Sequence, residues 1–528
     1  MVGKLFRSGV LAGLALVGAG GGASAQRTER ESVDSAGAQA TGSSSGVSLS
    51  ADGRFVVFSS DATNLVANDR NLSSDVFVHD RLTGVTALVS TDANGNQADD
   101  ASFFFSCDAI SDDGRFVGFT SDASNLVPGT IGFGDRVYVK DLQTGAIELV
   151  SVDSAGNEAN LAADFNAISA DGRFAVFDSL ASNLVAGDTN GAFDVFVHDR
   201  QTGTTECASL DATGVPGDSD SEFGAVSADG RFVAFRSFAD DLVSGDVNGA
   251  WDVFVRDRQS GTTERVSVDA SGAAANGDSN HPSISADGRF VAFESAATNL
   301  VAGDTNGALD VFVHDRQTGA TERMSVATGG AESDDDSERP CISADGVHVA
   351  FTGFADDLVA GDGNGWPDVF VHDRSTGATE RMSVDAAGGD ADAPSFDCAI
   401  TADGRFVGFA SFADDLVSSD TNADEDVFER GPWLTLEVDP AIVLSGNPLT
   451  FKTWSGQPLG ATLLVTTALN GSPLFGPLIP GSFDAAGKWV FSATVPGGLA
   501  GNVVTFATFG IVPPGKVAIS GPRNVSFQ

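Results

Sequence analysis

The chain has 528 residues, with 73 acidic and 29 basic side chains and a formal net charge of −44. A surface this acidic repels nucleic acid and anionic membranes, so we exclude nucleic-acid binding and expect an attraction for cations, although solubility or adaptation to salt would also explain the charge. Four cysteines in a chain of this length do not make a disulfide framework.

Residues 1–25 are typical of an export signal. Lys4 and Arg7 precede an apolar run over residues 10–17, and Ala-Ser-Ala stands directly before Gln26. The run is too short to span a bilayer, and no later stretch is long and apolar enough to do so. We therefore expect a mature chain that begins at Gln26, has no membrane span, and is secreted or periplasmic.

One phrase recurs seven times after the signal. It reads S-A-D-G-R-F-V-A-F or a close variant. The first two copies are 61 residues apart, and each later copy follows the one before it by 58 residues. Its glycines are Gly53, Gly114, Gly172, Gly230, Gly288, Gly346 and Gly404. In the fifth unit we expect strands over residues 281–286, 289–295, 310–315 and 321–326. A fixed period with four strands per unit predicts a radial array of small sheets.

The two ends of the repeat region complement each other. The seventh unit stops after its third strand, at Phe428, and residues 27–34 closely copy the fourth strand of another unit, residues 263–269. An N-terminal strand that completes the last sheet removes the exposed edges of an open array. We predict an all-β fold in which residues 26–431 form a seven-bladed β-propeller closed by its N-terminal strand.

Residues 432–528 differ in composition from the repeats. From residue 433 onward they hold only three acidic and four basic side chains, and proline and glycine punctuate short alternating runs. This pattern predicts a small C-terminal β-sandwich-like domain.

The cysteines occupy different places in the repeat. We expect Cys107 and Cys207 to be buried thiols, since they lie at unrelated repeat positions. Cys341 and Cys398 lie on the first strands of neighbouring units, on opposite faces. Because stacked sheets lie about 10 Å apart, we expect no bond between them.

The loops before the first and third strands share one face of the disc, here called the loop face, and the tight turns share the other, the turn face. The loop face varies between units and is acidic, so binding is expected there. Near the axis one first-strand slot carries Cys107, Phe165, Phe223, His281, Arg339 and Asp397. Our candidate ligand-binding residues are Glu222, His281, Glu338, Arg339 and Asp397. The alternative is that residues at the channel mouth are simply unconstrained.

The loop before the third strand reads D-x-N-x-x-x-D in six units. Oxygen ligands at this spacing in a glycine-bent loop suit calcium, so calcium is the predicted cofactor. The alternative is that the Asn makes a turn and the last Asp caps a strand. The candidate metal ligands are Asp69, Asn71, Asp75, Asp188, Asn190, Asp194, Asp246, Asn248, Asp252, Asp304, Asn306, Asp310, Asp362, Asn364, Asp368, Asp420, Asn422 and Asp426.

The repeat phrase, followed by D-V-F-V-H-D-R-x-T-G-x-T-E-R, resembles the TolB-type (WD-repeat-like) propeller repeat over about residues 28–430. The resemblance implies the fold and says little about function, since such repeats serve scaffolds, peptidase lids and other secreted proteins. No N-terminal α/β domain like that of TolB is present, so TolB's own role is not carried over.

Catalysis has little support in the sequence. His79, His198, His314 and His372 share one strand slot, and no nucleophile motif accompanies His281. We expect a secreted, non-catalytic binding or scaffold protein with a protein or glycan partner at its loop face. The alternative is a polysaccharide-active hydrolase or lyase with its site at the channel mouth.

Overall fold

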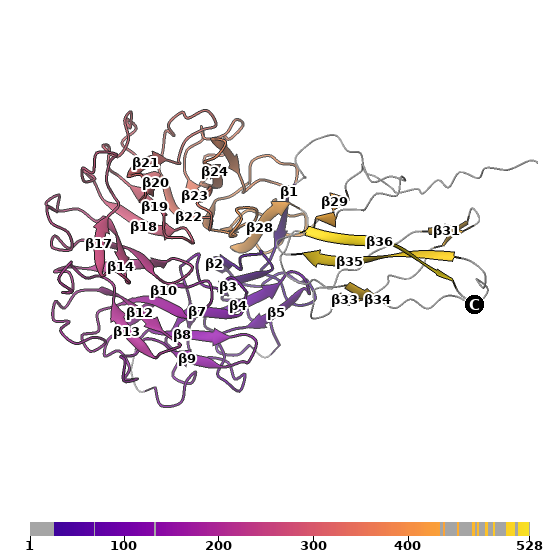
Figure 1. The fold of residues 1–528 in the computed structure, drawn as a ribbon, viewed down its shortest axis with the longest axis horizontal. Coiled ribbons are helices and arrows are strands. Elements are labelled where there is room, and N and C mark those ends of the chain that lie inside the picture. The colour runs from indigo at the N-terminus through magenta and orange to yellow at the C-terminus, as the bar shows by residue number, and fades with distance from the viewer. Residues whose placement is uncertain are drawn as a thin grey trace, which may run out of the picture. The chain divides into compact units, whose positions relative to one another are not determined.

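The computed structural model describes residues 26–67, 69–130 and 134–432, together with the backbone of strands between Glu437 and Ser526 (Figure 1). The expected signal, residues 1–25, lies outside the described residues. Contacts group residues 26–431 into one compact unit, and the described strands beyond it belong to another. Among the described residues, no helix is long and apolar enough to cross a membrane.

The first unit contains seven four-stranded antiparallel sheets, which are the blades of a propeller. Blade 1 has β2 (Ser44–Leu49), β3 (Phe55–Ser60), β4 (Asp75–Asp80) and β5 (Val85–Leu88). Blade 2 has β6 (Ser102–Phe103), β7 (Phe116–Ser121), β8 (Arg136–Asp141) and β9 (Ile147–Leu149). Blade 3 has β10 (Ala163–Ile168), β11 (Phe174–Ser179), β12 (Asp194–Asp199) and β13 (Thr204–Cys207). Blade 4 has β14 (Ser221–Val226), β15 (Phe232–Ser237), β16 (Asp252–Asp257) and β17 (Thr262–Arg265).

Blade 5 has β18 (Ser279–Ile284), β19 (Phe290–Ser295), β20 (Asp310–Asp315) and β21 (Ala320–Arg323). Blade 6 has β22 (Ser337–Ile342), β23 (His348–Gly353), β24 (Asp368–Asp373) and β25 (Ala378–Arg381). Blade 7 has β26 (Ser395–Ile400), β27 (Val407–Ser411), β28 (Asp426–Pro432) and β1 (Gln26–Arg30). The predicted seven-bladed, all-β propeller is confirmed.

Closure occurs as the sequence predicts, because β1 is the outer strand of blade 7, paired with β28. The chain stays attached beyond β1: the Glu31 N–H donates to the Val427 carbonyl at 2.8 Å, and the Ser32 hydroxyl donates to Asp426. Arg30 lies against Asp420 at 3.2 Å and Asp426 at 3.6 Å. The N-terminal segment thus joins the first and last repeats of the ring.

The repeat phrase builds the turn face and the contact between blades. In blade 5, Ser285 donates to Asp287 at 2.8 Å, which closes the turn. Gly288 has φ of +70°, and a Cβ built there would meet Phe232 Cδ2 of blade 4 at 2.2 Å. Arg289 next to it makes a bidentate pair with Asp315, at 2.8 and 2.7 Å. A Cβ would therefore displace the phenylalanine of the preceding blade, which explains the glycine of the phrase.

The C-terminal part is also β structure. One antiparallel sheet has the order β29-β30-β36-β35, with β29 (Glu437–Val438), β30 (Phe451–Lys452), β35 (Val503–Val512) and β36 (Lys516–Ser526). Two hairpins consist of β31 (Thr467–Leu469) with β32 (Ser472–Leu474) and β33 (Gly481–Phe483) with β34 (Trp489–Phe491).

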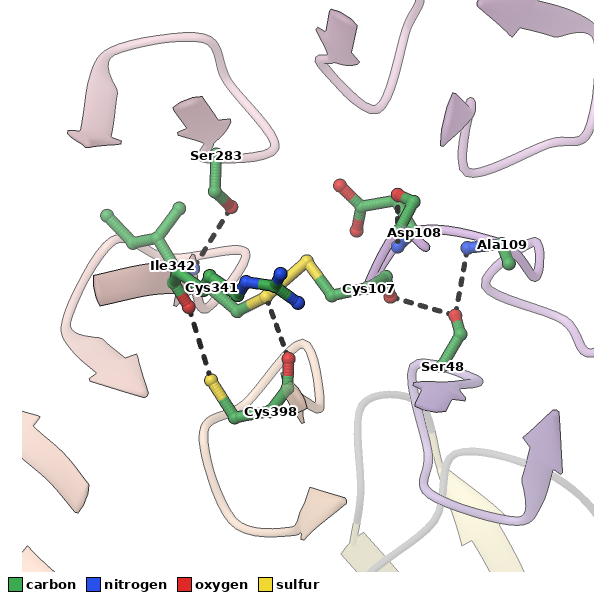
Figure 2. Close-up of a disulfide and its surroundings, with 10 residues drawn as sticks. Ser48, Cys107, Asp108, Ala109, Ser283, Cys341, Ile342 and Cys398 are labelled. Carbon is green, nitrogen blue, oxygen red and sulfur yellow. Dashed lines mark hydrogen bonds between the residues drawn. A yellow bond between two sulfur atoms is a disulfide. The ribbon is translucent and has the colours of Figure 1, made fainter. Parts of the chain in front are cut away.

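The expectation that Cys107 is a free thiol is wrong. Cys107 forms a disulfide with Cys341 of β22, with Cα atoms 6.7 Å apart (Figure 2). Cys207 and Cys398 are free and buried. The single 61-residue spacing explains the difference: its three extra residues follow β6 in blade 2. They carry Cys107 away from the first-strand slot and toward blade 6. Because blades 2 and 6 are not neighbours and first strands line the axis, the bond crosses the central opening.

Candidate functional site

The first-strand slot at the channel mouth is strained. Phe223, His281, Arg339 and Asp397 occupy this slot in blades 4–7 and have φ between +45° and +55°. Gly46 has φ of +58° at the same slot of blade 1. Each lies where the pairing of the first and second strands shifts register, at a β-bulge. A positive φ in a residue other than glycine costs about 1–2 kcal/mol, so this slot retains strain that glycine would remove.

Ion pairs and hydrogen bonds connect a set of residues that we call the polar arc, made of Glu222, Arg236, His281, Glu294, Arg339 and Asp397. Arg236 pairs with Glu222, and His281 Nδ1 lies 2.8 Å from Glu294 Oε1. Arg339 Nη1 lies 2.5 Å from Asp397 Oδ1, and the Arg339 N–H donates to Glu294 Oε2 at 2.7 Å. Arg236 also donates to Asn280 at 3.0 Å, which joins blades 4 and 5. The polar arc therefore runs continuously from blade 4 to blade 7.

Aromatic rings flank the polar arc in blade 4. The Arg236 guanidinium lies 4.3 Å from the ring centroids of both Phe223 and Trp251. The Phe223 ring lies 4.7 Å from the His281 ring, and Phe238 lies 5.6 Å from Trp251. Phe223 and Phe238 are partly exposed. The mouth thus combines charged hydrogen-bonding groups with ring surfaces.

Carboxyl groups at the mouth titrate in different ways. Burial raises the pKa of Glu294, but the hydrogen bond and charge of His281 and the Arg339 N–H outweigh it and hold this pKa low. Burial, with Glu294 nearby, raises the pKa of Glu338. Burial raises the pKa of Asp178 to about 7 and, with Asp397 nearby, that of Glu425 to about 7. Glu294 is therefore the ionised partner of His281, while Glu338, Asp178 and Glu425 retain protons more readily.

The structure brings the predicted ligand-binding residues together. Glu222, His281, Arg339 and Asp397 belong to the polar arc, and Glu338 interacts electrostatically with Glu294, Arg339 and His281. The sequence interpretation missed Arg236 and Glu294, which come from the second strands. Their slot also varies between blades, with Asp178 in blade 3 and Thr352 in blade 6, and that variation is the signal that could have identified them.

The six D-x-N-x-x-x-D loops hold their Asp pairs close together, but side chains neutralise most of them. In four loops one arginine lies against both carboxylates: Arg265 is 2.7 Å from Asp246 and 3.1 Å from Asp252. In the first loop the Gln97 amide donates to Asp69 and Asp75, at 2.7 Å each. The other arginine contacts are Arg30 with Asp420 and Asp426, Arg323 with Asp304 and Asp310, and Arg381 with Asp362 and Asp368.

The asparagines of these loops make turns. Asn190 Oδ1 accepts the Ala192 N–H at 3.1 Å, while its Nδ2 donates to the Gly217 carbonyl at 2.8 Å. The other five asparagines, Asn71, Asn248, Asn306, Asn364 and Asn422, make equivalent contacts. The turn interpretation of the asparagines therefore fits the structure.

Blade 3 differs from the others. Cys207 lies opposite Phe196 in the strand position that Arg265 takes opposite Phe254 in blade 4. Asp188 and Asp194 are 7% and 0% exposed, and burial raises the pKa of Asp194 to about 6. Cys207 Sγ lies 3.9 Å from Asp194. Among the six described Asp pairs, this is the pair with neither an arginine nor a glutamine between its carboxylates.

Two acidic clusters have ligand atoms close enough for a metal ion: Asp304, Asp310 and Glu332, and Glu29, Glu31 and Glu429. Each already surrounds a guanidinium. Arg323 lies 2.6 Å from Glu332, and Arg81 lies 2.5 Å from Glu429 and 3.1 Å from Glu31. The acidic groups could bind a metal, but in these clusters it would compete with an internal cation.

No family model and no curated protein matches the chain. Solved structures that match include TolB from Acinetobacter baumannii, with 16% identity, a TM-score of 0.35, and coverage of 64% of this chain and 62% of that chain. A putative TolB from Agrobacterium tumefaciens has 16% identity, a TM-score of 0.35, and coverage of 66% and 93%. An oligogalacturonate lyase in complex with manganese has 13% identity, a TM-score of 0.44, and coverage of 78% and 98%. These are likenesses only; the propeller fold follows from the seven four-stranded sheets of the structure itself.

Proposed function

We propose that this propeller is a secreted, non-catalytic binding protein that takes its ligand at the channel mouth. One observation carries the proposal: four successive blades place unlike side chains at one strained slot, with φ between +45° and +55°. Strain of this kind persists where the surrounding structure enforces it, and it clusters at functional sites. Secretion to the periplasm or beyond rests on the signal-like residues 1–25.

The geometry favours binding over turnover. Arg236 and Arg339 are each paired with a carboxylate, at Glu222 and Asp397, so their charges are already balanced. Pre-formed ion pairs with both donors and acceptors orient a ligand without needing to reorganise. This is the property of a recognition surface.

The test is an array of immobilised glycans and peptides probed with labelled protein. We expect saturable binding to at least one member, weakened at least about tenfold in Arg339→Ala. Arg289→Ala, on the turn face, is the matched control and should bind like the unmodified chain. Binding that is absent, or that is unaffected by Arg339→Ala, would contradict the proposal.

A second function is favoured by the contact between His281 and Glu294. Glu294 holds the Nδ1 side of the ring, so Nε2 could exchange a proton with a substrate, as in a polysaccharide-active hydrolase or lyase. Glu338 supplies a further carboxyl group with a raised pKa. Turnover of acidic or neutral glycans that is abolished by His281→Ala would establish the enzyme and overturn the non-catalytic proposal.

We further propose that calcium binds on the loop face, and at the blade 3 loop in particular. Asp188 and Asp194 are two buried carboxylates without the arginine that neutralises the equivalent pair in four other blades. A hard cation with flexible coordination would take the place of that guanidinium. Calcium also fits the acidic surroundings, which attract cations.

A further inference from the structure

The three extra residues of blade 2 form part of a loop over residues 104–108 that we call the strap. Its far end is fixed by the disulfide between Cys107 and Cys341 (Figure 2). Its near end covers the blade 1 slot: a Cβ at Gly46 would lie 2.9 Å from the Phe104 carbonyl. The strap thus fills, over blade 1, the position that side chains of the polar arc take in blades 4–7.

The strap brings apolar rings to the mouth. Phe105 is 80% exposed, and its ring lies 5.3 Å from the ring of Phe103. Most of the Phe105 ring is therefore left uncovered by the fold. Because Cys341 lies two residues after Arg339 on β22, the disulfide attaches the strap directly beside the polar arc.

We propose that the mouth binds a neutral saccharide, held between Phe105 of the strap and the hydrogen-bonding groups of the polar arc. This inference rests on the proposed binding function and names the ligand class. A sugar ring has an apolar C–H face that packs on an aromatic side chain and hydroxyl edges that both donate and accept hydrogen bonds. The polar arc offers both partners in alternation, since carboxylates accept and guanidinium groups donate.

Charged ligands fit this mouth less well. The repeat region holds 70 acidic and 23 basic side chains, a net charge of −47, and this field repels polyanions. A cationic ligand would have to compete with Arg236 and Arg339 for the carboxylates that they already hold. A neutral polyhydroxyl ligand meets neither penalty, because it can bridge an ion pair without separating it.

The experiment is titration calorimetry with neutral hexasaccharides of gluco, xylo, manno and galacto configuration. Hexagalacturonate, deacetylated chitohexaose and a lysine-rich hexapeptide serve as charged comparators. We expect at least one neutral saccharide to bind, with an affinity that changes little between about 0.05 and 0.5 M salt. Phe105→Ala and His281→Ala should each weaken binding at least about tenfold, whereas Phe105→Trp should retain it.

Leu82→Ala is the matched control, because Leu82 is an exposed apolar residue of a turn and its loss should leave the affinity unchanged. The double variant Cys107→Ser with Cys341→Ser frees the strap and should weaken binding as Phe105→Ala does. Neutral binding that Phe105→Ala and His281→Ala leave intact would overturn the assignment to the mouth. Binding of only a charged comparator, lost in His281→Ala, would overturn the ligand class and leave the binding function standing. Binding of no probe would overturn both.

Discussion

The two faces of the propeller are built from the same repeat but obey different rules. On the turn face, the same contact recurs in five successive blades: Arg289 pairs with Asp315 in blade 5 as Arg231 pairs with Asp257 in blade 4. On the loop face, one strained slot holds Phe223, then His281, then Arg339. Uniformity in a repeat therefore reflects packing, and variation at one slot of a regular repeat is the basis on which we propose the ligand site.

Electrostatics separates the faces in the same way. On the turn face a hydrogen-bonded arginine lowers the pKa of Asp257 and of Asp315. Near the mouth, burial raises the pKa of Asp178 to about 7 and of Glu425 to about 7. The turn face thus stabilises ionised Asp257 and Asp315, whereas burial near the mouth disfavours the ionised forms of Asp178 and Glu425.

The largest expected effect concerns β1, the N-terminal strand that completes blade 7. Deleting residues 26–36 removes β1 and leaves the buried Asp426 without Arg30 and Ser32. An unpaired buried charge alone costs about 3–5 kcal/mol, and the bare edge of β28 adds to this and invites association. We expect a much lower melting temperature and oligomers in size-exclusion chromatography. Arg30→Ala, which removes only the ion pairs, should have a smaller effect. An unchanged melting temperature and a monodisperse deletion variant would show that the ring closes in another way.

The blades, their strands and the closure could be predicted because each depends on a local sequence pattern. The repeat period predicts the blades and strands, and the copied fourth strand predicts the closure. The disulfide could not, because the path of a three-residue insertion across the axis depends on blades far apart in the sequence. Arg265 was missed as a partner of Asp246 and Asp252 because strand pairing, not sequence spacing, brings it there. Likewise His281 stood out in the sequence, but its partner Glu294 lies on another strand.

The turn face should not tolerate a methyl group where blades touch. Gly288→Ala places a Cβ 2.2 Å from Phe232 at a φ of +70°, so strain and overpacking add. We expect a loss of about 2–4 kcal/mol in the free energy of unfolding, measured by denaturant titration. Gly319→Ala is the control, with φ of +73° and no atom within 4 Å of the added Cβ. It should lose only about 1 kcal/mol, the cost of the backbone conformation. Equal losses in the two variants would refute the role of the contact.

The pKa contrast predicts opposite responses to pH. For Asp178, with a pKa raised from 3.8 to about 7, the folded chain holds a proton that the unfolded chain has lost. Its contribution to stability is full below pH 3.8 and is lost as the pH rises toward 7. Asp178→Asn should therefore flatten the fall in stability over this range by up to about 1 kcal/mol per pH unit. Asp315, with a lowered pKa, contributes above pH 3.8 and loses its contribution as the pH falls. Asp315→Asn should therefore lower the stability at neutral pH and flatten its fall on the acid limb.

At the strained slot of the loop face, a glycine should give a more stable fold than an alanine. Arg339 has φ of +51° and an exposed side chain, so both substitutions lose the same contact to Asp397 and differ in the backbone. We expect Arg339→Gly to be more stable than Arg339→Ala by about 1 kcal/mol, the reverse of the usual order in a strand. Denaturant titration of the two variants measures this difference. If alanine is the more stable, the slot is not strained.

The smallest expected effect tests calcium at the loop of blade 3. If calcium lies between Asp188 and Asp194, it adds about 0.4 kcal/mol of stability when its concentration equals the dissociation constant. Thermal unfolding must compare calcium with sodium at matched ionic strength, because screening also stabilises so acidic a chain. Magnesium should substitute poorly, since it demands tighter octahedral geometry.

Cys207→Arg should abolish the calcium effect and raise stability without calcium, because it supplies the guanidinium that Arg265 provides in blade 4. Asp135→Asn in the second repeat, which lacks the loop pattern, should leave the calcium effect intact. A calcium effect that persists in Cys207→Arg would place the ion elsewhere, and no calcium-specific effect at all would leave these loops as turns.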